Sequence, residues 1–377
     1  MRKFLLPILA AAVIFTPACK IRSSAAANPS QADTLAAVRS DVPILKEDKT
    51  IEDAARILAG MTVADDSPVA FWMEKAVWKQ HKTQMDTLWG TCNKTLQKVR
   101  NLAESDFADI NDRVKDVYYP FSGPDIAYAA SFYPKASTYW LFALENTGSV
   151  PDLSRLTDEA FGKYRYALLY HLQNSYFITL RMASDLDNSS IDGTIPLLLV
   201  FLVRMNYHIA SVTYKSLTPE GELVDSEKPA DAVEIAFFNR EENKLKTINY
   251  ISGNIKNRHI SEGLIKVFEH FPQETTAGYT KSCSYCMHRG YDWPRNTMLE
   301  RTFAVIQDDT GVRYNKYSKD TWDVTLYGGY VKPLPCFDDS CYQSDLDYAY
   351  HHRRDVKPLH FRHGYNRPSS LIVARKK

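Results

Sequence analysis

The sequence predicts an α/β protein with a mostly parallel sheet flanked by helices. Three observations lead to this expectation. A strand, a tight turn, a short helix and a second strand follow one another between residues 117 and 144, two long helical patterns come next, and strand-like runs then recur up to residue 327. Strands that alternate with helices are typical of βαβ units, because a connection between parallel strands needs a crossover.

The first unit consists of four short segments. Residues 117–121 are rich in aromatic and β-branched side chains, which favours a strand, and Ser122-Gly123-Pro124-Asp125 has the composition of a tight turn. Residues 126–132 then predict a short helix and 138–144 a second strand. The turn is therefore expected at the carboxyl end of a parallel strand.

Further elements follow along the chain. Thr157 is expected to cap a long amphipathic helix, and the run 195–203 is apolar on every side. A run of nine residues is too short to span a bilayer, which takes about 20 residues, so we expect a buried helix. Strand-like runs lie at 209–214, 233–238, 246–251 and 322–327, and the polar turn 239–243 joins the second to the third.

A helical extension is predicted at residues 49–112, before an α/β domain at 113–377. A short helix begins near Thr50, and a longer one follows Pro68. In the longer helix, apolar residues at steps of three, four or seven form one stripe: Trp78, Met85, Leu88, Cys92, Leu96 and Val99. Because Cys92 lies on this stripe, we interpret it as a buried core thiol rather than a nucleophile.

The N-terminus has the pattern of a bacterial export signal. Met1-Arg2-Lys3 is positively charged, and the fifteen residues from Phe4 to Ala18 are nearly uncharged and apolar. Thr16-Pro17-Ala18-Cys19 resembles a lipobox, although Thr16 stands where leucine is usual. Residues 1–19 are thus predicted to be a signal peptide with a lipobox, and Cys19 the site of lipid attachment, carrying fatty acids such as palmitate.

The segment at 20–48 is rich in Ala, Ser, Asn and Gln, which is typical of a flexible tether. The alternative is ordinary cleavage within 23–27, which would leave no lipid. That cleavage requires Lys20 and Arg22 in the c-region, which is unusual. We therefore expect a lipoprotein of the bacterial cell envelope, with inner and outer membrane both open.

The charge balance and the aromatic content of the chain bear on the class of ligand or partner that it binds. The chain has 46 basic and 45 acidic residues, so its charge gives no indication of nucleic-acid binding. Aromatic residues make up 12% of the chain. Such rings bind sugars and other amphipathic ligands in many secreted proteins, but core packing is the more common use.

Three motifs resemble a family of uncharacterised bacterial exported proteins and lipoproteins. They are Tyr119–Asp125 (YPFSGPD), Gln307–Val312 (QDDTGV) and Trp322–Gly328 (WDVTLYG), and the resemblance covers about residues 70 to 370. The family has no known activity, so the resemblance implies export and no catalytic residue. Its members usually lack the two cysteines found here in 281–286, which makes that pair a local addition.

Two cysteine pairs, Cys283-x-x-Cys286 and Cys336-x4-Cys341, have three interpretations. An oxidising compartment favours two local disulfides. A zinc site would need all four thiolates to converge, and redox catalysis would need the first pair at a helix start directly after a strand. We favour the disulfides and keep the other two open.

Histidines and arginines gather near the C-terminus. They are His351, His352, His360 and His363, beside Arg353, Arg354, Arg362 and Arg367. An anion or metal site is one interpretation, and a basic, solvated segment is the other. With no carboxylate cluster and no pair of histidines at helical spacing, we predict no metal.

The best candidate for a ligand site is the turn after the first strand. Ligands bind at the carboxyl ends of strands in open α/β sheets, which favours Ser122, Gly123 and Asp125. Glu145 follows the second strand, where Rossmann-like folds place an acid for a ribose hydroxyl. One glycine replaces the usual glycine-rich loop, and Ser122 lacks the G-x-S-x-G context of a hydrolase nucleophile.

Two function hypotheses follow. The leading one is a non-catalytic envelope lipoprotein that binds a small molecule or a partner. The alternative is an enzyme with a Rossmann-like, methyltransferase-like sheet acting at Ser122 to Glu145, with its cofactor unknown. A pocket enclosing Ser122, Asp125 and Glu145 would favour the enzyme, whereas a filled, dry region would favour the first hypothesis.

Overall fold

The computed structural model describes residues 44–177, 191–227 and 230–377. The signal peptide, Cys19 and most of the predicted tether lie outside the described residues. Every helix and strand discussed below belongs to one unit, Leu45–Lys377. Within the described residues, no helix is both long enough and apolar enough to cross a membrane.

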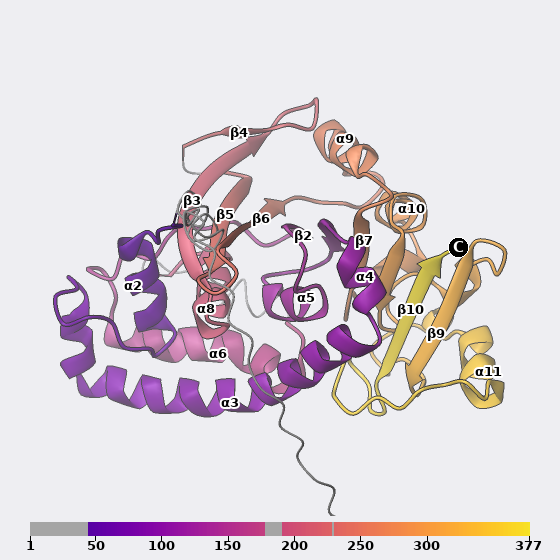
Figure 1. The fold of residues 1–377 in the computed structure, drawn as a ribbon, viewed down its shortest axis with the longest axis horizontal. Helices are drawn as coiled ribbons and strands as arrows, with labels where there is room; N and C mark the ends of the chain where they lie inside the picture. The colour runs from indigo at the N-terminus through magenta and orange to yellow at the C-terminus, as the bar shows by residue number, and fades with distance from the viewer. Residues whose placement is uncertain (1–43, 178–190, 228–229) are drawn as a thin grey trace, which may run out of the picture. The chain divides into compact units, whose positions relative to one another are not determined.

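Ten strands form one mixed sheet in the order β4-β3-β5-β6-β2-β1-β7-β8-β10-β9 (Figure 1). The strands are β1 Asp116–Pro120, β2 Thr138–Ala143, β3 His208–Leu217, β4 Leu223–Asp225, β5 Ala232–Asn239, β6 Lys244–Ser252, β7 Thr276–Thr280, β8 Ala304–Gln307, β9 Trp322–Gly328 and β10 Ser370–Lys376. Four neighbouring pairs are parallel and five are antiparallel. The α/β class is confirmed, but the prediction of a mostly parallel sheet is wrong.

Short connections explain the antiparallel part. The predicted polar turn joins β5 to β6, and its ends meet through a 2.9 Å hydrogen bond from Asn243 N to Asn239 O. A turn this short can only join antiparallel strands, because a parallel connection must cross the sheet. At the other edge, β10 lies between β8 and β9 and runs antiparallel to both. The parallel part is therefore limited to β6, β2, β1, β7 and β8.

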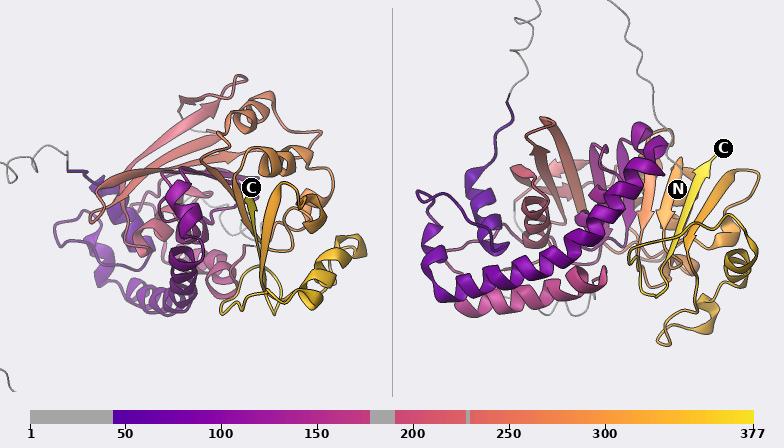
Figure 2. Two further views of the ribbon diagram at one scale, coloured as in Figure 1. Left: turned by 45° about the vertical axis from the view of Figure 1, so that its right-hand side comes forward. Right: turned by 60° about the horizontal axis from the view of Figure 1, so that its bottom comes forward.

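Helices cover both faces of the sheet (Figure 2). They are α2 Lys49–Leu58, α3 Ala76–Ser105, α4 Ala108–Arg113, α5 Ile126–Phe132, α6 Asp158–Asn174, α8 Ile195–Arg204, α9 Glu262–His270, α10 Asp292–Glu300 and α11 Ser344–His352. Val117 and Tyr119 of β1 pack in one core with α2, α3, α5, α6 and α8, whereas Tyr118 packs on the other face with α9 and α10. This alternation is the two-residue period of a strand.

The helical extension shares its core with the sheet. Helix α3 packs against α5 and α6. Its predicted stripe is buried except for Leu88, which is partly buried, and Cys92 is 2% exposed. This confirms the interpretation of Cys92 as a core thiol. The apolar helix α8 is likewise buried from Ile195 to Val203.

The first βαβ unit brings the two predicted site segments to one edge. Helix α5 begins at Ile126 as predicted, because the Asp125 side chain caps it by accepting a 3.3 Å hydrogen bond from Tyr128 N. Strands β1 and β2 pair in parallel, with Pro120 opposite Phe142. The turn after β1 and Glu145 after β2 therefore lie at the same end of neighbouring strands.

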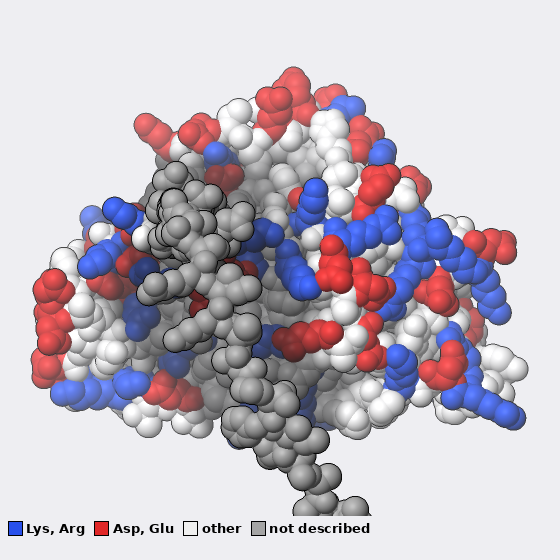
Figure 3. Space-filling model, viewed as in Figure 1, with Lys and Arg blue, Asp and Glu red and all other residues white. Residues whose placement is uncertain are grey.

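Basic and acidic side chains are interspersed on the face shown in Figure 3, so neither sign of charge dominates that surface. This agrees with the nearly equal counts of basic and acidic residues in the sequence.

Candidate functional site

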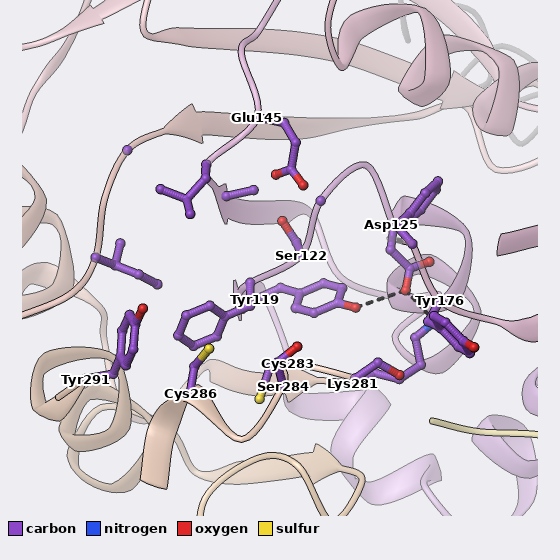
Figure 4. A pocket seen from close by; sticks show the side chains of 18 of the residues that line it. Tyr119, Ser122, Asp125, Glu145, Tyr176, Lys281, Cys283, Ser284, Cys286 and Tyr291 are labelled. Carbon is purple, nitrogen blue, oxygen red and sulfur yellow. Dashed lines mark hydrogen bonds and ion pairs between the residues drawn. The ribbon is translucent and has the colours of Figure 1, made fainter. Parts of the chain in front are cut away.

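A pocket opens at the carboxyl ends of β1, β2, β6 and β7 (Figure 4). Its empty volume is about 910 Å³, including the solvent at its mouth. Ser122, Gly123, Asp125 and Glu145 all line it, so the structure brings together the four residues that the sequence singled out. The rest of the lining comes from Tyr176 and Phe177 after α6 and from the loops that follow β6 and β7.

The turn after β1 leaves room above its backbone. Phe121 and Gly123 have left-handed backbone angles, with φ of 60° and 52°. A Cβ atom on Gly123 would meet only Phe177, at 3.8 Å. Ser122 is 4% exposed, and its N–H and hydroxyl both donate to Phe142 O, at 3.0 and 3.4 Å. The serine thus fastens the turn to β2, and a ligand can approach the glycine closely.

Asp125 forms a buried ion pair with Lys281, which directly follows β7. Asp125 Oδ2 lies 2.7 Å from Lys281 Nζ, and each side chain is 2% exposed. The same carboxylate oxygen accepts a 2.9 Å hydrogen bond from the Tyr119 hydroxyl. Lys281 Nζ also donates to Ser175 O and lies 3.8 Å from the centroid of the Tyr128 ring. The ammonium thus contacts a carboxylate, a backbone oxygen and an aromatic ring, and the pair holds the pocket floor together.

Burial and attraction act on this pair in opposite directions. Burial raises the pKa of Asp125 and lowers the pKa of Lys281, because it penalises the charged form of each. Their mutual attraction opposes both shifts. At a separation of 2.7 Å, with two further donors on Asp125, we interpret the two groups as charged.

His171 of α6 lies beside the ion pair. Its Nε2 is 3.4 Å from Asp125 Oδ1, but without the geometry of a hydrogen bond, and neither ring nitrogen has a hydrogen-bond partner among the described residues. The ring stacks on Phe177, with centroids 4.2 Å apart. Burial lowers the pKa of His171 well below its usual value, so the imidazole is neutral.

The loop after β7 has an unusual backbone. Ser282, Ser284 and Tyr285 all have positive φ, between 54° and 57°, without being glycine. Such conformations cost about 1 to 3 kcal/mol each and persist only where the surroundings enforce them. Ser282 and Ser284 line the pocket, so this strain lies at the candidate site.

The loop after β8 holds this strained loop in place. Asp308 Oδ2 accepts from Ser282 N at 2.8 Å, and Thr310 Oγ1 accepts from Cys283 N at 2.9 Å. Asp309 adds a third bond by accepting from the Tyr285 hydroxyl at 2.6 Å. The QDDTGV motif therefore acts on the pocket indirectly, as the support of its wall.

The two acids of that support are buried next to each other. Burial, followed by repulsion from Asp309, raises the pKa of Asp308 to about 7. Burial also raises the pKa of Asp309, whose carboxylate accepts from the Ser370 hydroxyl at 2.8 Å. The charge state of the support therefore changes near neutral pH.

The structure gives no support to the predicted disulfides, because Cys283, Cys286, Cys336 and Cys341 are all free thiols in it. Cys283 donates to Thr310 O at 2.9 Å and lines the pocket together with Cys286. Burial raises the pKa of Cys286 to about 11 and that of Cys283 further, so both are neutral and weakly nucleophilic. Across the described ranges, no group of three or more His, Cys, Asp or Glu side chains could hold a metal ion.

The C-terminal histidines do not converge. His351, His352 and His360 are exposed, whereas His363 is 1% exposed. The Nε2 atom of His363 lies 3.3 Å from the Tyr279 hydroxyl, which fixes it in the core. Among the arginines of this segment, Arg362 lies near the pocket: its guanidinium is 5.8 Å from the ring centroid of Tyr176, which lines it.

Sequence reasoning missed the groups that complete the pocket. Lys281 and Tyr291 of the lining, and His171 beside the ion pair, come from segments distant from the first βαβ unit. The only local signal was a lysine directly after a strand-like run, and such lysines are usually solvated. Their convergence follows from the order of β2, β1 and β7 in the sheet.

Comparisons of the chain with protein-family models, with curated proteins and with solved structures found no match. The geometry of the pocket is therefore the basis for a functional proposal.

Proposed function

We propose that this chain is an exported lipoprotein, anchored through Cys19, that binds a small polyhydroxylated molecule in the pocket. A sugar and the ribose of a nucleoside both present this chemistry. The single observation that carries the proposal is the convergence of a carboxylate, serine hydroxyls and aromatic rings in one open pocket. The pocket is concave and largely apolar, with a few convergent polar groups, as is typical of small-molecule sites.

The polar and apolar groups suit such a ligand. The carboxylate of Glu145 and the hydroxyl of Ser122 point toward each other across the cavity (Figure 4). A carboxylate accepts hydrogen bonds from neighbouring ligand hydroxyls, as an acid does for ribose in dinucleotide-binding sheets. Phe121 and Tyr291 meet edge to face, with ring centroids 5.2 Å apart, and offer an apolar wall for the C–H face of a ring.

A pocket lined by Ser122, Asp125 and Glu145 is the outcome expected for the enzyme hypothesis, but the chemistry of the lining favours binding over catalysis. Ser122 donates its hydroxyl to a backbone carbonyl, and the cysteines of the lining are neutral thiols. Asp125 and Lys281 are engaged with each other and with further partners. Among the described lining residues, these groups hold the pocket in shape, and none is arranged as an activated nucleophile with its base.

The strand order favours a second candidate. When strands β3 to β5 are left out, β1, β2, β6, β7, β8, β9 and β10 can be numbered 1 to 7 along the chain. Their order across the sheet is then 3-2-1-4-5-7-6. Strand 7, which is β10, is antiparallel to both of its neighbours. The first five positions of this order are those of Rossmann-like sheets, which bind their cofactor at the carboxyl ends of the strands where the order reverses. This order supports S-adenosylmethionine as the ligand and methyl transfer as the activity, although the loop after β1 lacks the glycine-rich pattern.

One experiment tests both candidates. The full-length protein in detergent micelles would be titrated calorimetrically with neutral hexoses, adenosine and S-adenosylmethionine. We expect binding of at least one hydroxylated ligand, with Glu145→Gln weakening it about tenfold or more through the loss of a charged acceptor. Glu159→Gln, at an exposed position of α6, is the matched control and should leave affinity unchanged.

The outcomes separate the hypotheses. Binding of S-adenosylmethionine, together with transfer of its labelled methyl group to any acceptor, would replace the binding proposal by the second candidate. Failure of every ligand to bind, or equal affinity of Glu145→Gln and the parent, would refute the proposed site.

A further inference from the structure

We infer that the ligand carries a negatively charged group, a phosphate or a carboxylate, and that this group binds against the pocket wall formed by Ser282 and Ser284 after β7. This inference rests on the proposed function and adds the charge of the ligand. The polyhydroxylated part would lie at Glu145 and the anion at the opposite wall.

The two ends of the pocket are far enough apart for this arrangement. Glu145 follows β2 and the serine loop follows β7, with β1 between these strands. Neighbouring strands are about 4.8 Å apart, so the two walls are separated by about 10 Å. Figure 4 shows Glu145 and Ser284 on opposite sides of the cavity. A sugar or nucleoside can bridge this distance and keep its anion away from the glutamate.

The serine wall offers hydrogen-bond donors. The hydroxyl oxygen of Ser282 is buried and has no hydrogen-bond partner among the described residues. The hydroxyl of Ser284 forms a 3.0 Å hydrogen bond with that of Tyr365, which donates in turn to Ser282 O at 2.6 Å. If Tyr365 donates only to Ser282 O, the Ser284 hydroxyl proton is the one between them, and an incoming anion can accept it instead.

The backbone of the same loop is suited to an anion. Ser284 and Tyr285 have positive φ, and no described residue accepts a hydrogen bond from either N–H. Unpaired N–H groups of successive residues in a turn are the donors that backbone anion sites use. A binding role explains why the strain at this loop is retained, supported by three hydrogen bonds from the loop after β8.

The guanidinium of Arg362 is connected to this wall through Tyr365. Arg362 donates to Asn174 Oδ1 at 2.6 Å and to Tyr365 O at 3.4 Å. Within the described ranges it is ion-paired to no carboxylate, and its Nε is buried without a hydrogen-bond partner. The acids facing the loop are Asp308, which accepts from Ser282 N, Asp309, which accepts from the Tyr285 hydroxyl, and Asp125, which pairs with Lys281. Arg362 adds a positive charge on this side of the pocket.

The test uses matched ligands on the full-length protein. Calorimetry would compare a neutral hexose with its 6-phosphate and its uronate, and adenosine with its monophosphate. We expect at least one anionic member to bind about tenfold more tightly than its neutral counterpart, as expected for charge-assisted hydrogen bonds. The phosphate and uronate arms distinguish the two kinds of anion.

Variants locate the subsite. Arg362→Ala and Ser284→Ala should each remove most of the preference for the anionic ligand over its neutral counterpart, whereas Arg362→Lys should keep part of it. Arg353→Ala is the control, because that arginine pairs with Asp355 at 2.6 Å on the neighbouring segment. Equal binding of neutral and anionic ligands would overturn this inference and leave the proposed function standing. If no ligand binds at all, both fall.

Discussion

Asp125 and Lys281 form an ion pair of 2.7 Å in which each side chain is 2% exposed, although one caps α5 and the other follows β7. The pair joins the two loops that form the floor of the pocket. Removing one partner of a buried pair leaves an uncompensated charge in a medium that solvates it poorly. The pair is therefore a sensitive point for both stability and ligand binding.

Lys281→Met should lower the free energy of unfolding by about 3 to 5 kcal/mol, because it leaves the Asp125 carboxylate buried and unpaired. The double variant Asp125→Asn/Lys281→Met should be more stable than the sum of the single effects predicts. Denaturant unfolding of the parent, of each single variant and of the double variant measures this coupling. Additive effects would show that the two charges do not depend on each other.

Asp308 makes the stability depend on pH. Its pKa in the folded protein is raised to about 7 from an ordinary value of 3.8, so the folded state holds a proton that the unfolded state has already released. The stabilisation is present below pH 3.8 and is lost as the pH rises through about 7. Melting temperatures should therefore fall across this interval.

The control for this prediction is another acid. Asp308→Asn should flatten the dependence of the melting temperature on pH, whereas Asp355→Asn should leave it in place, because Asp355 is exposed and its pKa is lowered to about 2 by Arg353. An unchanged profile in Asp308→Asn would assign the effect to other groups.

The state of the cysteines separates the sequence-based prediction from the structure. The structure has five free thiols among the described residues, so alkylation in denaturant without reductant should label all five. Under native conditions, exposed Cys336 should react before buried Cys92 and Cys283. Intact mass spectrometry counts the labels. Four cysteines that react only after reduction would establish the two disulfides instead.

The lipid anchor remains a prediction from the sequence. Cys19→Ala should abolish fatty-acid labelling and release the protein from membranes, because several acyl chains are needed to hold a protein firmly in a bilayer. Fractionation and labelling of growing cells measure both. Wild-type labelling of the variant would refute lipidation at Cys19.

The sequence by itself determined the elements whose signals are local. The strand-like runs, the tight turn and the short helix after it define β1, α5 and β2 within one residue of their observed ends. Because a right-handed crossover follows from such a unit, the shared edge of Ser122 and Glu145 could also be expected. The apolar run of α8 and the stripe containing Cys92 were likewise readable, since periodicity reports which side of a helix is buried.

The features that depend on which strands are neighbours in the sheet were decided only by the tertiary structure. The sequence indicated strands at β3, β5 and β6 but not the antiparallel part of the sheet that they form. The ion-pair partner of Asp125 could not be predicted from the sequence either, because the pairing of β7 with β1 brings Lys281 to it. Strand order is set by the burial of both faces of the whole sheet. The free energy of this burial is summed over segments that are distant in the sequence, so no local sequence pattern predicts the strand order.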